Sequence, residues 1–494
     1  RDLENWTLAA RPLNRPDLLD LSGVPDSCGV WAPCLSWHDG LFHLCYTVVR
    51  RFDGNFKDTH NYLTTCATID GDWSKPVYLD SSGFDPSMHH AEDGRKWYLS
   101  MVWDHRPDRT FFRGIALREY CPSRRQLVGE RKFIFDGTAF DCTEGPHLYR
   151  YGDFYYLLAA EGGTGYEHVV TVARSRDLEG PYEVDPAGPL VTARYSPVHP
   201  LQRTGHGDIV RTPGGRLFIV FLCSRPLPGT RRSPLGRESA IQELVETDDG
   251  WFRLKSGSSL PLPELEIDLD GTGSAKRASA TAEEVIRYGF DSDDLPDDFQ
   301  WLRSPRPERL FSLRERPGNL RLHGRESIGS FYEQALVARR QTHFRFRAET
   351  ALEFEPAHFQ QMAGLVCYYN ASKFHYLYVS RDEEVGKHLA VMSCEGEILL
   401  DAVFPEYGNR VAVPEGQKLH LRVDVDGARL VFSWSADGDA WNEFPVSLDA
   451  SLLSDEAGKG EGAQFTGAFV GICCQDMAGT GRPADFRYFC YEGR

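Results

Sequence analysis

Long apolar runs are missing from this sequence. No stretch approaches the roughly 20 apolar residues that a helix needs to cross a bilayer, so no membrane span is predicted. Positive charge is also in the minority, because 55 Lys and Arg stand against 72 Asp and Glu and leave a net charge of −17. That balance argues against nucleic acid or an anionic membrane as a partner, and it says little about a neutral one.

Cysteine spacings of the kind found at metal sites are absent as well. The 12 cysteines include one adjacent pair, Cys473 and Cys474, which lies in an apolar stretch. This use of cysteine predicts reduced core thiols and a cytoplasmic location. A secretory signal peptide is not visible, although the sequence begins at Arg1 rather than at Met.

Short strand-like runs fill most of the chain. Its 494 residues exceed an ordinary single core, which predicts two domains, and the 12% of aromatic residues are spread through these runs. Residues from about 255 to 282 are instead rich in Ser, Gly, Pro and acids, as in a linker. We therefore predict an all-β protein with a first domain at 1–254, a linker at 255–287 and a β-sandwich at 288–494.

A repeat organises the first domain. The stretch 79–103 reads LDSSGFDPSMHHAEDGRKWYLSMVW, a hairpin whose first strand begins at Asp85. Similar stretches begin with Trp31, Glu144 and His206, and the four heads are spaced by 54, 59 and 62 residues. Repeats of this length are typical of a β-propeller, in which the innermost strands begin around one mouth. An aromatic plate, two carboxylates and an imidazole would then face one pocket, and these groups suit the binding and cleavage of a sugar.

The start of the chain predicts a fifth blade. The tetrapeptide Arg1–Glu4 recurs as Arg176–Glu179, where it leads from a strand to the outer edge of a blade. We therefore expect the chain to open near the outer edge of a first blade whose inner strand lies upstream of residue 1. With the four blades predicted between about residues 29 and 254, that blade would complete a five-bladed β-propeller.

An ordered set of motifs resembles a known family. In chain order the motifs are WAPCL, FKDTHNYL, SSGFDPS, WDHRP, TEGPHLY, AEGGTGY, GHGD, PLGRE and TDDGW, followed by FTGAFVGICCQD and ADFRYF. Together they resemble the β-xylosidases of glycoside hydrolase family 43, and the resemblance covers nearly the whole chain. It implies a five-bladed propeller with a C-terminal β-sandwich that contributes to the active-site pocket. It also implies hydrolysis of glycosidic bonds with inversion.

The resemblance assigns roles to two carboxyl groups. Inverting hydrolysis needs a carboxylic acid to protonate the leaving oxygen and a carboxylate to activate water, about 6.5–9.5 Å apart. Glu144 in TEGPHLY matches the general acid, and Asp85 in GFDPS matches a third carboxylate that raises the pKa of the acid and orients it. The general base of the family is an Asp in the first blade's inner strand, so we expect it upstream of residue 1. A polypeptide that truly began at Arg1 would be severely impaired in hydrolysis.

The resemblance also implies a set of side chains around one sugar. They are aromatic walls at Trp31, Phe84 and Trp103, the last toward the leaving sugar, a guanidinium at Arg237, supporting groups at Lys57 and Thr164, and a ring from the sandwich, Phe465, that closes the pocket. His206 in GHGD matches a substrate-site histidine at the propeller axis that contacts a central cation or its waters. We expect no required cofactor, and a divalent cation such as calcium would be held at His206 directly or through water.

Each of these residues also has a purely structural interpretation. Asp85 before a proline would fit a turn, Glu144 an exposed strand start, and Trp31 a core position. His206 between glycines would fit a satisfied buried imidazole, and Arg237 an ion pair with the acid that follows it. The repeat favours the functional interpretation for Asp85, whereas for His206 the two interpretations stand equal.

The main hypothesis is an exo-acting, inverting glycoside hydrolase that releases D-xylose from the non-reducing ends of β-1,4-xylo-oligosaccharides. Exo action is favoured because a propeller mouth partly roofed by a second domain forms a pocket, whereas a long polymer needs an open groove. The alternative is α-L-arabinofuranosidase activity, alone or beside xylosidase activity, since the two sugars present similar hydroxyls. A non-catalytic carbohydrate-binding propeller is a further alternative, supported only by the missing base strand. The sequence leaves open whether the chain forms a homo-oligomer.

Overall fold

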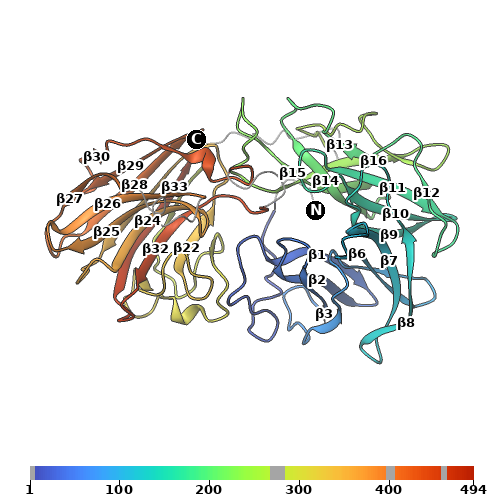
Figure 1. Ribbon diagram of the computed structural model, residues 1–494, viewed down its shortest axis with the longest axis horizontal. Coiled ribbons are helices and arrows are strands. Elements are labelled where there is room, and N and C mark those ends of the chain that lie inside the picture. The colour runs from blue at the N-terminus through green and yellow to red at the C-terminus, as the bar shows by residue number, and fades with distance from the viewer. Residues whose placement is uncertain (1–5, 268–283, 397–405, 458–463) are drawn as a thin grey trace. The chain divides into compact units, whose positions relative to one another are not determined.

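The computed structural model describes residues 6–267, 284–396, 406–457 and 464–494, and confirms the predicted all-β class. The helical elements in these residues are the 3-10 turns η1 (Pro307–Arg309) and η2 (Ala450–Leu452). None of the helices described is long and apolar enough to span a membrane. The chain forms two compact units (Figure 1): unit 1 is Arg1–Leu19, Ser27–Arg225 and Arg237–Arg277, and unit 2 is Asp20–Asp26, Pro226–Gly236 and Ala278–Arg494.

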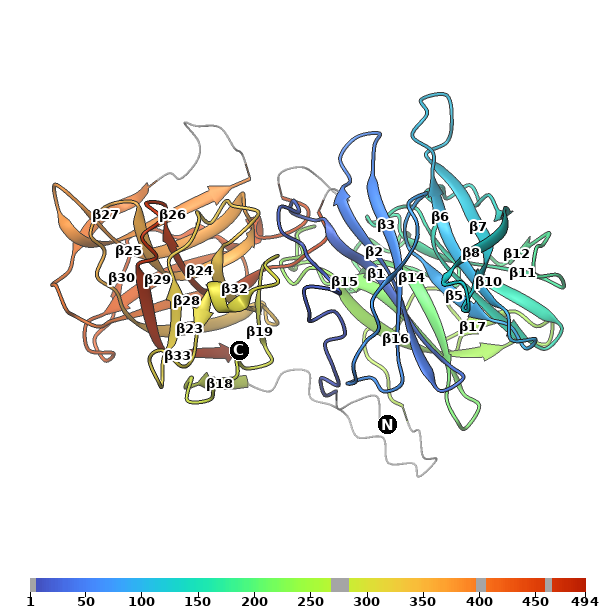
Figure 2. The ribbon, with the colours of Figure 1, turned by 90° about the horizontal axis from the view of Figure 1, so that it is seen from below.

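Unit 1 consists of four antiparallel sheets, each built from strands that follow one another in the chain. Blade 1 is β1 (Gly29–His38), β2 (Leu41–Arg51), β3 (Asp58–Cys66) and β4 (Val77–Asp80), and Figure 2 shows β1, β2 and β3 side by side. Blade 2 is β5 (Ser87–His90), β6 (Lys96–Trp103), β7 (Phe112–Cys121) and β8 (Gln126–Phe135). Blade 3 is β9 (Glu144–Tyr151), β10 (Phe154–Glu161), β11 (Val169–Ser175), β12 (Glu183–Val184) and β13 (Val191–Thr192). Blade 4 is β14 (Gln202–Arg211), β15 (Leu217–Ser224), β16 (Glu238–Glu246) and β17 (Phe252–Leu254).

The prediction of five blades is wrong for the residues that the structure describes, which hold four. Residues 6–28 contain turns but no strand. Part of this segment is instead tied to blade 1, because the Tyr46 hydroxyl donates to the Leu18 carbonyl at 3.1 Å and Arg15 Nη2 donates to the Trp73 carbonyl at 2.9 Å. The tetrapeptide Arg1–Glu4, on which the fifth blade was predicted, lies outside the described residues.

The first strands of successive blades are neighbours, which gives unit 1 its propeller-like arrangement. β1 packs beside β5, β5 beside β9, and β9 beside β14. Ser87 Oγ donates to the Pro146 carbonyl at 2.5 Å, and the Ile209 amide donates to the Tyr149 hydroxyl oxygen at 2.8 Å. Because the innermost strands are linked in this way, the residues at their heads are brought close together although they are far apart in sequence.

Unit 2 contains two antiparallel sheets. The nine-stranded sheet has the order β20-β21-β33-β23-β28-β29-β30, with β18 paired to β33 and β31 to β29. Its strands are β18 (Glu284–Tyr288), β20 (Phe311–Ser312), β21 (Leu320–His323), β23 (Arg345–Glu353), β28 (Leu419–Asp426), β29 (Arg429–Ser435), β30 (Asn442–Glu443), β31 (Leu448–Asp449) and β33 (Pro483–Gly493). The seven-stranded sheet is β19 (Phe299–Trp301), β22 (Ala335–Arg340), β32 (Phe469–Asp476), β24 (Gln361–Asn370), β25 (Lys373–Asp382), β26 (Gly386–Glu395) and β27 (Glu406–Ala412).

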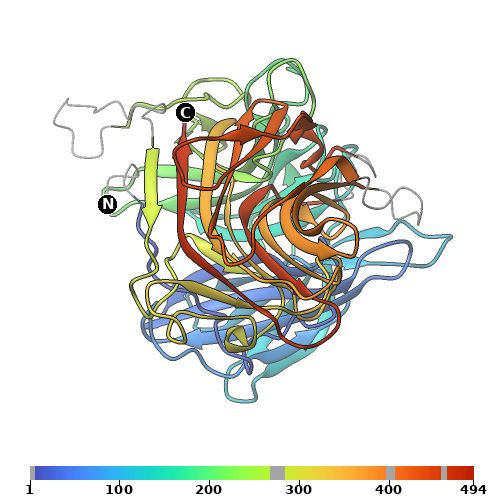
Figure 3. The same cartoon turned by 90° about the vertical axis from the view of Figure 1, so that its left-hand side faces the viewer.

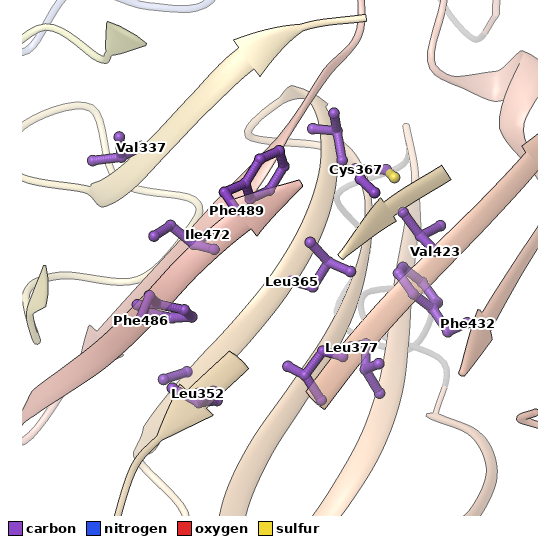
Figure 4. Packing of buried hydrophobic residues seen from close by; sticks show 14 of the residues in the cluster. Val337, Leu352, Leu365, Cys367, Leu377, Val423, Phe432, Ile472, Phe486 and Phe489 are labelled. Atoms are coloured by element: carbon purple, nitrogen blue, oxygen red, sulfur yellow. The ribbon is translucent and has the colours of Figure 1, made fainter. Parts of the chain in front are cut away.

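The core of unit 2 is formed by the facing sides of these two sheets. Figure 3 shows their long, curved strands in yellow to red. Figure 4 shows buried side chains of the nine-stranded sheet, such as Phe432 and Phe486, beside Leu365 and Ile472 of the seven-stranded sheet. Alternating residues of each strand point into this layer, which is the packing predicted for a β-sandwich. Cys473 and Cys474 are buried thiols of β32, as predicted.

Leu365→Ala should destabilise unit 2. Leu365 is 0% exposed in β24, so its removal loses buried apolar surface and leaves a cavity between the sheets, an effect of about 2–5 kcal/mol in the free energy of unfolding. Urea denaturation followed by tryptophan fluorescence measures it. Val285→Ala in β18 is the control, because Val285 is 66% exposed and should change the free energy of unfolding by less than about 0.5 kcal/mol. Equal effects of the two substitutions would contradict this account of the core.

Candidate active site

A left-handed residue marks the head of the first strand in each blade. The residues concerned, with their φ angles, are Ala32 (37°), Asp85 (56°), Gly145 (57°) and His206 (50°). A positive φ interrupts ordinary strand geometry and redirects the side chains beside it. The pairing register of β1 and of β14 shifts at the same place. The structural repeat therefore aligns Asp85 with Gly145, and Glu144 stands one residue earlier, at the position of Phe84.

Asp85 links its own blade to the next two. It is 7% exposed, its Oδ2 accepts the Gly145 N–H at 3.0 Å, and His206 Nδ1 lies 4.0 Å from the same oxygen. Burial raises the pKa of Asp85, whereas the charge of His206 and the Gly145 N–H favour the carboxylate and oppose that rise. Glu144 directly precedes Gly145 in the chain. The structure thus brings together three predicted residues, Asp85, Glu144 and His206.

Glu144 is a buried acid beside a second acid. It is the first residue of β9 and is 6% exposed. Burial raises the pKa of Glu144 well above its ordinary value, the negative charge of Asp85 raises it further, and the ammonium of Lys57 opposes both effects. Glu144 therefore has the character of a carboxylic acid that keeps its proton near neutral pH, next to a carboxylate that does not.

Aromatic rings stand beside this pair. The rings of Trp31 and Phe84 meet edge to face, with centroids 5.5 Å apart and planes at 88°. The ring of Phe52, which no motif in the sequence pointed to, also lies beside Trp31, with ring centroids 5.7 Å apart. The indole Nε1 of Trp31 donates to the Ser27 carbonyl at 2.8 Å, which fixes the ring. Since Phe84 precedes Asp85 in the chain, the aromatic wall and the carboxyl pair belong to one region of unit 1.

Lys57 joins the aromatic wall to the acid. Its ammonium lies 4.3 Å from the centroid of the Trp103 ring, donates to the Phe52 carbonyl at 2.7 Å and interacts electrostatically with Glu144. Burial lowers the pKa of Lys57, and the carboxylate of Glu144 opposes that shift. The indole Nε1 of Trp103 donates to the Asn55 carbonyl at 2.8 Å. A cavity of about 510 Å³ opens beside Lys57 and Trp103, with walls from blades 1 and 2.

His168 is a buried histidine that sequence motifs did not identify. It is 0% exposed, and its Nδ1 lies 3.3 Å from the Arg203 carbonyl oxygen. A Cβ on Gly205 would lie 2.3 Å from the ring of His168, so only glycine leaves room for it. Burial lowers the pKa of His168 to about 3, and the charges of His206 and Arg237 add to the effect. His168 is therefore neutral, and it lies near His206 and Arg237, which were both predicted to bind the substrate. The glycine before His206 was the only feature of the sequence that indicated His168.

The remaining predicted residues have separate positions. Thr164 is half-buried in the loop between β10 and β11, and Arg237 is half-buried directly before β16. Phe465 belongs to unit 2, so its predicted role in closing the pocket stays a prediction. The described residues contain no group of three or more His, Cys, Asp or Glu side chains that could hold a metal ion. A central cation at His206 also stays a prediction.

The arrangement is able to transfer a proton to an oxygen atom that is held against the aromatic wall. Glu144 can supply the proton, because burial and the negative charge of Asp85 raise the pKa of its carboxyl group. Trp31 and Phe84 supply apolar surface of the kind on which the C–H face of a sugar stacks. The chemistry that fits these parts is acid-assisted cleavage of an acetal.

Both halves of the chain match known protein families. Residues 1–252 match the family described as Glycosyl hydrolases family 43. Residues 287–492 match the family described as Beta xylosidase C-terminal Concanavalin A-like domain. The second match agrees with the sandwich of unit 2.

Individual relatives match over the whole chain. Xylosidase/arabinosidase 43B of Humicola insolens is 50% identical over 100% of this chain and 90% of its own length. Beta-xylosidase of Bacillus subtilis is 45% identical over 100% of this chain and 92% of its own length. The crystal structure of xylan beta-1,4-xylosidase from Bacillus Halodurans superposes with a TM-score of 0.93 at 43% identity, over 100% of this chain and 92% of that one.

Proposed function

We propose, because the chain belongs to glycosyl hydrolase family 43, that it is an exo-acting β-xylosidase that releases D-xylose from the non-reducing ends of β-1,4-xylo-oligosaccharides. The observation that carries the proposal is the buried pair of Glu144 and Asp85, linked through the Gly145 amide. Relatives at 45% and 43% identity are named as a beta-xylosidase and a xylan beta-1,4-xylosidase, which supports xylose as the sugar.

In this proposal Glu144 is the general acid that protonates the oxygen of the leaving sugar. Asp85 holds the pKa of Glu144 up and orients it through the Gly145 N–H, and it is not the base that activates water. Trp31 and Phe84 stack on the xylose ring, and Trp103 faces the leaving sugar. Thr164, His206 and Arg237 bind sugar hydroxyls. The reaction inverts the anomeric configuration.

A second activity is part of the proposal. The relative at 50% identity is named a xylosidase/arabinosidase, which favours some α-L-arabinofuranosidase activity beside xylosidase activity. Values of kcat/KM for nitrophenyl β-D-xylopyranoside and nitrophenyl α-L-arabinofuranoside separate the two. We expect the xyloside to be the better substrate. Faster turnover of the arabinofuranoside would make arabinofuranosidase the main function, and binding of xylobiose without turnover of either glycoside would indicate a non-catalytic propeller.

Exo action has its own test. Incubation with xylohexaose should release xylose from the first minutes, with xylopentaose as the only other early product. Early appearance of xylotriose and xylobiose together would indicate cleavage inside the chain and contradict a pocket. Proton NMR of the first product should show α-xylose, because inversion of a β-linkage yields the α-anomer.

A further inference from the structure

The cavity beside Lys57 and Trp103 has a composition that xylose binding does not require. Its volume is about 510 Å³, and it is lined by residues of β3, β6, β7 and β8 and of segments before and between these strands. The rings of Phe56, Trp103 and Phe133 contribute to its walls, and the hydroxyl groups of Ser81 and Ser82 lie among them. Aromatic faces and hydroxyl groups of this kind suit a sugar, and the position next to Trp103 is the one proposed for the leaving sugar.

The cavity is also positively charged in a negatively charged protein. Its lining carries four cationic side chains, namely Lys57, Arg106, Arg113 and Arg131, against two acids, Asp58 and Asp104. The whole chain has a net charge of −17. A local excess of positive charge at a concave surface attracts an anion, whereas the binding of a neutral xylo-oligosaccharide does not require a net charge.

The three guanidinium groups of the cavity differ in their partners. Arg106 Nε donates to Asp104 Oδ1 at 2.8 Å, and this bond lowers the pKa of Asp104 to about 2. Arg113 lies 4.3 Å over the ring of Phe133 and donates to Asp136 Oδ1 at 2.7 Å. Both groups are thus already occupied by a carboxylate.

Arg131 has no ion-pair or hydrogen-bond partner among the side chains that the structure describes. It lies on β8 two residues before Phe133, and alternate residues of a strand share a face, so both line the cavity. A guanidinium with a planar fork of donors is the group that proteins use to bind a carboxylate.

We propose that this cavity binds a uronic acid carried by the leaving part of the substrate. The carboxylate of the uronic acid binds Arg131, and its ring packs against the aromatic rings that line the cavity. The inference rests on the proposed function, because it places the leaving group of the xylosidase reaction beside Trp103. The enzyme then accepts or prefers xylo-oligosaccharides whose next xylose bears a glucuronosyl group. Arg131 acts in substrate selection and takes no part in the cleavage of the bond.

The test compares two ligands that differ only in the glucuronosyl group. One is xylotriose, and the other is xylotriose with a glucuronosyl group on O2 of the middle xylose. Arg131→Gln should lower kcat/KM for the acidic ligand by about tenfold and leave the value for xylotriose unchanged, since one charge-assisted hydrogen-bonding group is lost. Lys132→Gln is the matched control. It removes the same charge from the next residue of β8, whose ammonium pairs with Glu179 instead of lining the cavity.

Binding measured without turnover separates this inference from the proposed function. Calorimetric titration of Glu144→Gln with the two ligands should give tighter binding of the acidic one, and adding Arg131→Gln should abolish the difference. Raising the salt concentration from about 0.05 to 0.5 M should also weaken the preference, because screening shortens the reach of the charge. Free glucuronate or acetate at the same concentration should compete weakly, since each lacks the xylose chain.

Several results would overturn the inference. They are equal losses on both ligands with Arg131→Gln, equal losses with Arg131→Gln and Lys132→Gln, and equal binding of the two ligands by Glu144→Gln. Competition by acetate as strong as that of the acidic oligosaccharide would reduce the site to a general anion site and contradict a uronic acid site. Failure of the wild-type protein to hydrolyse xylotriose would instead contradict the proposed function, and the binding comparison would still decide the inference.

Discussion

Glu144→Ala is expected to lower kcat/KM for xylobiose by about 10²–10⁴-fold, the usual contribution of a positioned general acid. The structure gives the reason, since Glu144 is buried beside the Asp85 charge and its raised pKa keeps it protonated. The loss should depend on the leaving group. A dinitrophenyl xyloside departs with little need of a proton, so its turnover should fall far less than that of xylobiose.

A series of aryl xylosides with leaving-group pKa values from about 4 to 10 measures this dependence. The wild-type rates should vary little along the series, and those of Glu144→Ala should fall steeply as the leaving group becomes more basic. Glu144→Gln serves as the control for packing, because it keeps the volume of the side chain without the acidic proton and should show the same steep dependence. Parallel losses along the whole series would remove Glu144 from the role of acid and leave it a structural one.

The strands of unit 2 were predictable from local pattern. The run FRFRAETALEFE alternates apolar and polar residues, and the structure forms β23 (Arg345–Glu353) there. The run KLHLRVDVDGARLVFSWS turns at Asp-Gly, and Gly427 has a φ of 62° between β28 and β29. Such features are visible in sequence because they depend on neighbours in the chain, namely the period of two and the backbone that a tight turn requires.

The repeat of unit 1 was predictable in its spacing and one residue out in its register. Asp85 and Glu144 were matched as heads of equivalent strands, whereas the left-handed residues pair Asp85 with Gly145. The two acids were matched because they share a chemical type, whereas only the backbone conformation reveals which residue bends the strand. The predicted number of blades was wrong because the fifth blade was inferred from the recurrence of only four residues. Residues 6–28, which follow that tetrapeptide, form no strand.

Features that depend on the meeting of distant residues were the hardest to predict. His168 lies against Gly205, and Phe52 stands against Trp31, yet neither His168 nor Phe52 belongs to a motif with a chemical signature. The short segments 20–26 and 226–236 group with unit 2 although their neighbours in the chain belong to unit 1. The Ser233 amide donates to Glu456 Oε2 at 2.9 Å, a pairing across more than two hundred residues that no local pattern encodes.

Asp85→Asn is expected to move the alkaline limb of the pH–rate profile to lower pH. A general acid must be protonated to act, so activity falls as the pH rises through its pKa. The negative charge of Asp85 raises the pKa of Glu144, and an uncharged asparagine removes that contribution while burial continues to act. The pKa of Glu144 therefore falls, and the limb moves with it. Above the limb, activity drops by about tenfold for each pH unit of the displacement.

The sign of this shift depends on which member of the pair holds the proton. The Gly145 N–H and the His206 charge both favour the carboxylate of Asp85, and the carboxylate of Asp85 disfavours that of Glu144. The pair therefore loses its first proton mainly from Asp85 and its second mainly from Glu144. Asparagine keeps an oxygen that accepts the Gly145 N–H, so the strand heads stay in place and the change in charge is isolated.

Profiles of kcat/KM against pH for the wild type, Asp85→Asn and Asp208→Asn decide between tuning and mere positioning. Asp208 lies two residues after His206 in β14, and its carboxylate accepts the Tyr149 hydroxyl, so its replacement removes an equal charge without touching the acid. Its alkaline limb should stay at the wild-type pH. If Asp85→Asn lowers the rate uniformly at every pH, Asp85 acts only by holding Gly145 and Glu144 in position, and the electrostatic account of the acid fails.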